Sequence, residues 1–351
     1  MTRAELTDMI DLARRLLAAE EAGVFSTLFA SNGSTYRPLG SMMVSGPPTL
    51  LAGGISGGCL EQYVARTGRL LTATKPAAML SFDADPDHDD GAKPILGCGG
   101  SIEVLVERLT SEHLTFLEAV RSAMESDDAS AALCTVDMHD SHPARVSRTW
   151  IDATSIAARH THNIETSGES RKLLHYIPPM TRFVIFGAGD DVQPLCTTAR
   201  GLGWHVTVVD RRARLATAAR FSGADRVIGD DWPTAIGQIT FTENTAVVLM
   251  THSLVDDIEI LPLLRDKPMF YVGSLGPDHR REWLIDGVLQ TTTLSESFIA
   301  NVRGPIGLNL GDRTATGIAV SITAEIIAQL NQRTPTSLSH PKPHRRETQS
   351  S

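Results

Sequence analysis

Two cysteines in the N-terminal half have glycines as neighbours, and their thiols are the first candidates for chemistry. Cys59 lies in the segment GGISGGCLE, and Cys98 lies in LGCGGS. Cys59 falls at the predicted start of a helix over 60–71, where the positive helix end stabilises the thiolate, the form that reacts and binds metals. Two such thiols suit a soft metal or a sulfur-transfer reaction, and the alternative for each is a small residue in a tight turn. The adjoining glycines, which permit close approach of a ligand, are Gly57, Gly58, Gly99 and Gly100.

A second candidate site begins where the apolar segment 181–186 runs directly into a Gly-x-Gly turn. Gly187 permits the tight turn, Gly189 lets a pyrophosphate approach the backbone, and the following helix is expected to present free N–H groups to the anion. Asp210 ends the next apolar segment, 23 residues after Gly187. A spacing of about 20 residues is typical of a carboxylate that binds a ribose diol. The combination predicts a dinucleotide-type phosphate site.

Two features of this turn leave an alternative open. Val192 stands where a third glycine is usual, and Asp190 and Asp191 open the helix. Acids suit the positive end of a helix dipole, but they repel a phosphate there. A Rossmann scaffold that no longer binds a nucleotide is therefore the alternative. The two arginines after Asp210 would admit a 2′-phosphate or form a solvated helix start.

Other side chains give further candidates. Arg37, in the loop GSTYRPLG, would supply the charge of an anion cradle, unless this is a plain surface loop. His252 follows an apolar strand and suits a general acid or base, or a packed loop histidine. No tyrosine has lysine four residues later. The acidic run 83–90 is interpreted as a solvated loop, and Cys134 and Cys196 as core residues.

Composition excludes several classes of protein. The 351 residues carry a net charge of −9 and no long basic run, so nucleic acid is not an expected partner. No apolar run approaches the ~18 residues of a membrane-spanning helix. The N-terminus resembles neither a signal nor a transit peptide, and we expect a cytoplasmic protein. Four cysteines without a C-x-x-C pair indicate neither a disulfide framework nor an all-cysteine zinc site.

The chain divides into segments of different character. Residues 1–151 mix helix and strand signals and predict an α/β domain. Residues 152–180 are polar, contain two adjacent prolines and are interpreted as a linker. Residues 181–330 alternate short apolar strands with helix-length segments, which predicts a Rossmann-like domain with a parallel sheet covered on both faces. Residues 331–351 are interpreted as a disordered tail.

Several segments in the same order resemble the xanthine dehydrogenase accessory family, XdhC/CoxI. They include GGISGGCLEQYV, LGCGGSIEVLVE, VIFGAGDDVQPLC and GPIGLNLGDRTATGIAVSI. The resemblance implies an N-terminal XdhC/CoxI domain followed by a C-terminal Rossmann domain. It further implies an accessory protein that binds molybdenum cofactor, helps it receive a sulfido ligand from a cysteine desulfurase, and hands it to a molybdenum hydroxylase.

The resemblance places Cys59 and Cys98 at the family's cysteine positions. Our hypothesis is that these two thiols lie near the molybdenum or handle sulfur, while Gly187, Gly189 and Asp210 hold the phosphate or nucleotide end. The cofactor is molybdopterin or its dinucleotide form, and a cofactor-binding chaperone is favoured over a catalyst. The alternative is an NAD(P)-dependent oxidoreductase that uses the Rossmann turn. A homodimer is one option for the assembly.

Overall fold

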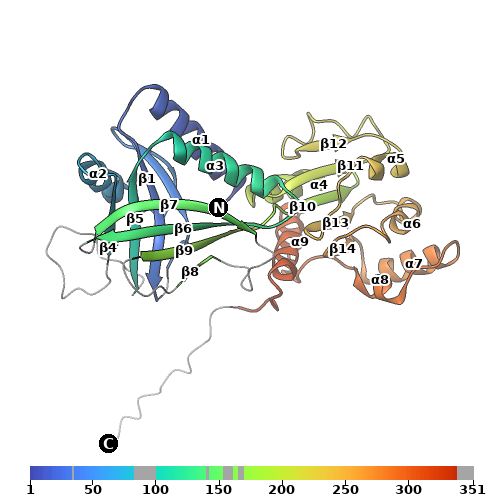
Figure 1. Ribbon diagram of the computed structural model, residues 1–351. Coiled ribbons are helices and arrows are strands. Elements are labelled where there is room, and N and C mark those ends of the chain that lie inside the picture. The colour runs from blue at the N-terminus through green and yellow to red at the C-terminus, as the bar shows by residue number, and fades with distance from the viewer. Residues whose placement is uncertain (34, 83–99, 140–141, 153–160, 165–169, 338–351) are drawn as a thin grey trace, which may run out of the picture. The chain divides into compact units, whose positions relative to one another are not determined.

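The computed structural model describes residues 1–33, 35–82, 100–139, 142–152, 161–164 and 170–337, and the chain divides into two units between Met180 and Thr181 (Figure 1). The N-terminal unit contains two antiparallel sheets and their covering helices. Its elements are α1 (Arg3–Ala18), β1 (Val24–Asn32), β2 (Met42–Gly46), β3 (Leu50–Gly53), α2 (Glu61–Thr72), β4 (Ala77–Phe82), β5 (Ser101–Arg108), α3 (Ser111–Glu125), β6 (Ser130–His139), β7 (His142–Asp152), β8 (His162–Ile164) and β9 (Ser170–Ile177).

The first sheet has the strand order β3-β2-β1-β5-β4 and is covered on both faces. Helices α1 and α3 pack with Phe25 and Val44 on one face, whereas α2 packs with Val24 and Val106 on the other. Alternate residues of β1 therefore enter different cores, as the period of a strand requires. Helix α1 begins with a capping box in which Thr2 and Glu5 exchange hydrogen bonds with each other's backbone.

The second sheet has the strand order β7-β6-β9-β8, and its strands β8 and β9 lie in the segment 152–180 that the sequence analysis interpreted as a linker. Strand β9 pairs with β6 from Ser170 to Ile177, and β8 pairs with β9. The segment looked irregular because backbone hydrogen bonds, rather than apolar side chains, hold β8 in place. Only Leu173, Leu174 and Ile177 of β9 are buried. Residues 153–160 and 165–169 lie outside the described residues.

The C-terminal unit is a Rossmann-like domain, as predicted. Its six strands are all parallel, in the order β12-β11-β10-β13-β14-β15. The elements are β10 (Arg182–Phe186), α4 (Val192–Gly201), β11 (His205–Val209), β12 (Arg226–Ile228), α5 (Trp232–Gly237), β13 (Thr245–Leu249), α6 (Leu254–Leu263), β14 (Tyr271–Ser274), α7 (Asp278–Leu289), α8 (Glu296–Asn301), β15 (Val302–Arg303) and α9 (Ala315–Leu330).

Two hydrophobic cores cover the two faces of this parallel sheet. Leu195 of α4 and Ile322 of α9 belong to the first core, and Ile236 of α5, Ile260 of α6 and Leu284 of α7 belong to the second. Burial of both faces explains the nearly continuous apolar strands of the sequence. Residues 331–337 are exposed, and the remainder of the predicted tail lies outside the described residues. Among the described helices, none combines the length and apolar character needed to cross a bilayer.

Candidate functional site

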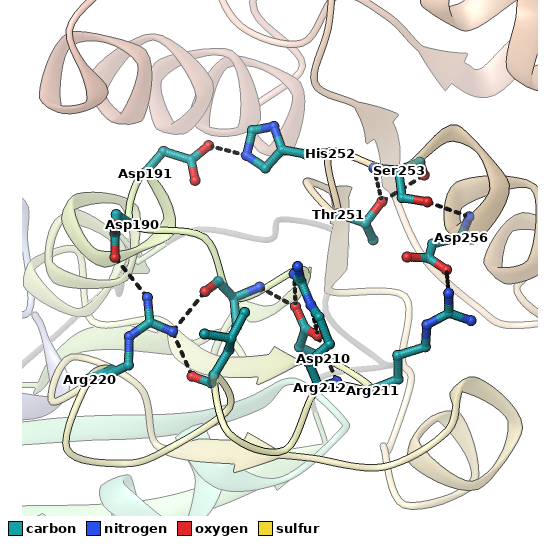
Figure 2. Close-up of polar contacts among 12 residues, drawn as sticks. Asp190, Asp191, Asp210, Arg211, Arg212, Arg220, Thr251, His252, Ser253 and Asp256 are labelled. Atoms are coloured by element: carbon teal, nitrogen blue, oxygen red, sulfur yellow. Dashed lines mark hydrogen bonds and ion pairs between the residues drawn. The ribbon is translucent and has the colours of Figure 1, made fainter.

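The parallel sheet reverses its direction of winding between β10 and β13, and this switch point is where open α/β sheets bind ligands. Phe186, the last residue of β10, is in register with Val209 of β11 and Leu249 of β13. The turn beginning at Gly187 therefore lies between Asp210 and Met250. We use the name switch-point loops for residues 187–191 and 250–253, shown with their polar contacts in Figure 2.

The backbone requires glycine at one position of the first switch-point loop, Gly187, whereas Gly189 leaves space beside two side chains. Gly187 has φ +121°, and an added Cβ would overlap the backbone carbonyl of Met250. A Cβ at Gly189 would overlap the Asp191 carboxylate and lie 3.3 Å from Nε2 of His252. The two glycines thus permit the loops after β10 and β13 to approach closely. The approach of a pyrophosphate at Gly189, expected from the sequence, stays a prediction.

The N-terminus of α4 differs from the prediction. The N–H groups of Val192 and Gln193 donate to the carbonyl oxygens of Gly189 and Asp190, and Pro194 has no N–H. The helix itself therefore offers no free donor in its first three residues. Within the described part of the chain, the N–H groups of residues 189–191 donate to no other group. An anion at this turn would bind to these three consecutive N–H groups.

Asp210 is buried and already fully hydrogen-bonded. Its Oδ2 accepts from the Ala188 N–H at 2.8 Å and from Nη2 of Arg212 at 2.6 Å. Its Oδ1 accepts from the backbone N–H and from Nε of Arg212, both at 2.8 Å. Burial alone raises the pKa of Asp210, but the hydrogen bonds from Arg212 and Ala188 outweigh it and hold the pKa below its ordinary value. A ribose diol would reach this carboxylate only by displacing Arg212.

The two acids that open the helix are each paired with a base from another segment. Asp190 Oδ1 lies 2.7 Å from Nη2 of Arg220, and Asp191 Oδ2 lies 3.0 Å from Nε2 of His252 (Figure 2). His252 adopts φ +59°, a left-handed conformation that is uncommon outside glycine and asparagine. Its ring connects the two switch-point loops. The repulsion of a phosphate by Asp190 is therefore partly neutralised by Arg220.

A buried network supports the loop after β13. Asp257 accepts a hydrogen bond of 2.6 Å from the Thr251 hydroxyl and one of 2.7 Å from Nη2 of Arg280. Burial raises the pKa of Asp257, although Thr251 and Arg280 oppose the shift. The sequence analysis missed Arg220, Asp257 and Arg280. Apolar pattern and motif spacing give no signal for them, because each acts through a residue distant in the chain.

Cys59 is exposed on a loop that is fastened by two polar side chains. The Glu61 carboxylate accepts from the Ser56 hydroxyl at 2.5 Å and from backbone N–H groups of Ser56 and Leu60. The Cys59 Sγ lies 3.6 Å from the Ser56 hydroxyl oxygen. Helix α2 begins at Glu61, so Cys59 precedes the helix rather than lying on its first turn. Sequence analysis also missed Ser56 and Glu61.

The glycines around Cys59 have separate structural reasons. Gly58 has φ +108°, whereas a Cβ at Gly57 would press on the ring of the exposed Tyr36. Arg37 is half-buried and pairs with Glu5 at 2.8 Å. Its charge is thus directed to α1, not into a free anion cradle.

The other predicted thiols divide into two groups. Cys98 and Gly99 lie outside the described residues, and Gly100 is buried immediately before β5. Cys134 and Cys196 are core residues, as predicted. Burial raises the pKa of the Cys134 thiol to about 11 and that of the Cys196 thiol to about 12. Among the residues described, no three His, Cys, Asp or Glu side chains are placed to hold a metal ion.

A cavity of about 400 Å³ lies in the N-terminal unit between α3 and β7. Glu107 forms an ion pair with Arg148, and its Oε1 lies 3.2 Å from Nε2 of His113. Burial raises the pKa of Glu107, but Arg148 and His113 oppose it and lower the pKa to about 2. Glu107 and Arg148 balance each other's charge, so this pair does not present an unpaired charge to a ligand in the cavity.

Comparison with known proteins agrees with this arrangement of domains. Residues 183–326 match the profile of the XdhC Rossmann domain, and residues 16–83 match that of the XdhC and CoxI family. A relative in Bacillus subtilis, described as a probable xanthine dehydrogenase subunit, is 28% identical over 89% of this chain and 94% of its own. The molybdenum cofactor insertion chaperone PaoD of Escherichia coli is 23% identical over 92% of this chain and 90% of its own.

A solved structure is similar to this chain along nearly its whole length. The crystal structure of a xanthine dehydrogenase from Bacillus halodurans superposes with a TM-score of 0.73 at 25% identity, and covers 95% of this chain and 98% of that one. The two family profiles fall in the two structural units, and the relatives align along nearly the whole chain. This chain therefore belongs to the XdhC/CoxI family, the xanthine dehydrogenase accessory proteins.

Proposed function

We propose that this chain binds molybdenum cofactor, supports its sulfuration and delivers it to a molybdenum hydroxylase of the xanthine dehydrogenase type. Similarity to PaoD, which is named as a molybdenum cofactor insertion chaperone, supports an accessory role. The observation that carries the proposal is the row of N–H groups at 189–191, beside the Arg220 guanidinium. It is suited to a phosphate that belongs to a carried ligand.

The residues present fit such a ligand at its anionic end. Molybdenum cofactor brings a phosphate, or a diphosphate with a ribose in its dinucleotide form, and a dithiolene that holds the metal. Gly187 and Gly189 shape the turn whose N–H groups would bind the phosphate. Asp210 fixes the turn through the Ala188 N–H and holds Arg212, whose side chain is 45% exposed, beside it. In this proposal Arg212, rather than Asp210 directly, faces the ligand.

The exposed Cys59 is the group we assign to sulfur handling, together with Cys98. Ser56 and Glu61 hold the loop in one conformation and leave the thiol accessible. An accessible thiol is the group from which sulfur transfer proceeds. A cysteine desulfurase and the client hydroxylase are the partners that this proposal requires.

The second candidate is an NAD(P)-dependent oxidoreductase, which the same Gly-x-Gly turn would serve. The hydrogen bonding of Asp210 weakens this alternative for NAD, because both carboxylate oxygens are already used. His252 is the side chain at the switch point that would act as its acid or base.

Mass spectrometry of the ligand tests the proposal. The full-length chain is purified from a host that makes molybdenum cofactor, and the ligand released by denaturation is identified. We expect a molybdopterin or its dinucleotide. Release of NADP, with measurable hydride transfer, would establish the oxidoreductase instead, and release of neither would contradict both.

The assigned thiols are tested separately, by reconstitution of the client hydroxylase. The double variant Cys59→Ser/Cys98→Ser should fold normally and lose activation of the client. Cys134→Ala, which removes a core thiol, is the matched control and should retain activation in proportion to its folded fraction. Full activation by the double variant would remove the role assigned to the two cysteines.

A further inference from the structure

The first switch-point loop contains an acid whose position at a phosphate turn calls for an explanation. Asp190 is 91% exposed, and its carboxylate pairs with Arg220 at 2.7 Å. Its own backbone N–H is one of the three loop donors that have no acceptor among the described residues. A carboxylate at this point repels an incoming phosphate and also occupies the cation that would attract it.

Arg220 is held in place independently of Asp190. Its Nη1 donates to the carbonyl oxygens of Ala188 and Leu215, at 2.9 and 2.8 Å. Its guanidinium also lies over the Phe221 ring at 5.1 Å. The side chain is 26% exposed, whereas Asp190 is almost entirely in solvent. Arg220 would therefore stay beside the turn if Asp190 moved away.

The second acid is held differently. Asp191 is 22% exposed and pairs with His252 across the two switch-point loops. Its side chain also lies against Gly189, within the turn. Of the two acids, Asp190 is thus the one that can leave its basic partner at little cost in free energy, because exposed ion pairs contribute little to stability.

We propose that the Asp190 carboxylate competes with the anionic group of the carried ligand for Arg220. The phosphate or diphosphate of the ligand displaces the Asp190 carboxylate from Arg220 and binds to the guanidinium and these N–H groups of the loop. When the ligand leaves, Asp190 returns to Arg220. The carboxylate therefore lowers the affinity of the turn and helps a carrier to release what it holds. This inference rests on the proposed carrier function and concerns the regulation of the same site.

The test is to neutralise Asp190 and measure anion affinity in the full-length chain. Asp190→Asn should bind inorganic pyrophosphate about two- to tenfold more tightly than the wild type by isothermal titration calorimetry, since both the competition and the repulsion are removed. The gain should shrink at high salt. It should also shrink when Asp190→Asn is introduced into the Arg220→Gln variant, because there only the repulsion remains to be removed.

Asp266→Asn is the matched control. Asp266 is 84% exposed, lies 3.1 Å from Arg265, and precedes β14 at the amino edge of the sheet, opposite the switch point. The change in net charge is the same, and we expect no change in affinity. Cytidine diphosphate, titrated in parallel, distinguishes a nucleotide source of the anion from a bare phosphate group. A gain from Asp190→Asn with either probe supports the inference.

Equal affinities of wild type and Asp190→Asn would overturn the inference, as would an equal gain in Asp266→Asn. Failure of every variant to bind pyrophosphate or cytidine diphosphate would overturn it as well. The identity of the co-purified ligand is measured independently. A molybdenum cofactor found in the wild type, without an effect of Asp190→Asn, would thus refute the competitor and leave the proposed function intact.

Discussion

The Asp210–Arg212 pair gives a prediction whose magnitude follows from unequal burial of the two partners. Asp210 is 1% exposed and Arg212 is 45% exposed. Asp210→Ala leaves the buried N–H of Ala188 without its acceptor, which costs about 1–3 kcal/mol. The released guanidinium is hydrated at little cost. We therefore expect the unfolding free energy of the C-terminal unit to fall by about 2 kcal/mol in this variant.

Arg212→Ala should be the milder change. The carboxylate keeps both backbone donors, and the lost contacts come from a side chain that is partly in solvent. Because water partly replaces the contacts of the half-exposed guanidinium, we expect a loss of about 1 kcal/mol, the net value of a typical hydrogen bond. Without Arg212, burial raises the pKa of Asp210 relative to the wild type. The carboxyl group then contributes less stability above its ordinary pKa, and the difference between variant and wild type should close as the pH falls below about 4.

Urea unfolding followed by tryptophan fluorescence measures both losses. Three of the four tryptophans, Trp204, Trp232 and Trp283, lie in the C-terminal unit. The double variant should be no less stable than Asp210→Ala alone, because the arginine has no partner left. The reasoning fails if Arg212→Ala is the more destabilising change, or if Asp210→Ala unfolds at the wild-type urea concentration.

Two further predictions concern the cysteines and the N-terminal unit. Under native conditions iodoacetamide should alkylate the exposed Cys59 and spare Cys134 and Cys196, because burial raises the thiol pKa of these two to about 11 and about 12. Peptide mass spectrometry identifies the modified cysteine. Modification of either buried thiol at the rate of Cys59 would contradict the burial. The pKa of Glu107 is lowered to about 2, so the contribution of this carboxylate to stability is present above pH about 4.5 and is lost as the pH falls towards 2. Glu107→Gln should therefore flatten the acid-unfolding curve of the N-terminal unit between these pH values. An unchanged curve would refute the assignment.

The C-terminal domain was predictable because its signals are local. Parallel strands buried on both faces are continuous apolar runs, and β10 begins within one residue of the start predicted from the segment 181–186. The tight turn is likewise a local requirement, because Gly187 adopts φ +121°. The apolar spacing of Leu6, Ile10 and Ala13 in α1 is a local signal of the same kind.

The second sheet of the N-terminal unit was not predictable in this way. Strand β9 is held by pairing with β6, and its neighbour β8 has three residues. Backbone hydrogen bonds between distant segments leave little trace in composition. A polar segment of this kind looks like a linker until its partner strand is known.

The candidate site shows the same division. The types and spacing of Cys59, Gly187, Gly189 and Asp210 follow from the sequence alone, because each reflects a local backbone or side-chain requirement. The tertiary structure decided what those residues contact. It engaged both oxygens of Asp210 with Arg212 and Ala188, and it paired each acid of the turn with a base from another loop. Such pairs form only when the chain brings distant loops to one edge of the sheet, and no periodicity in the sequence records that meeting.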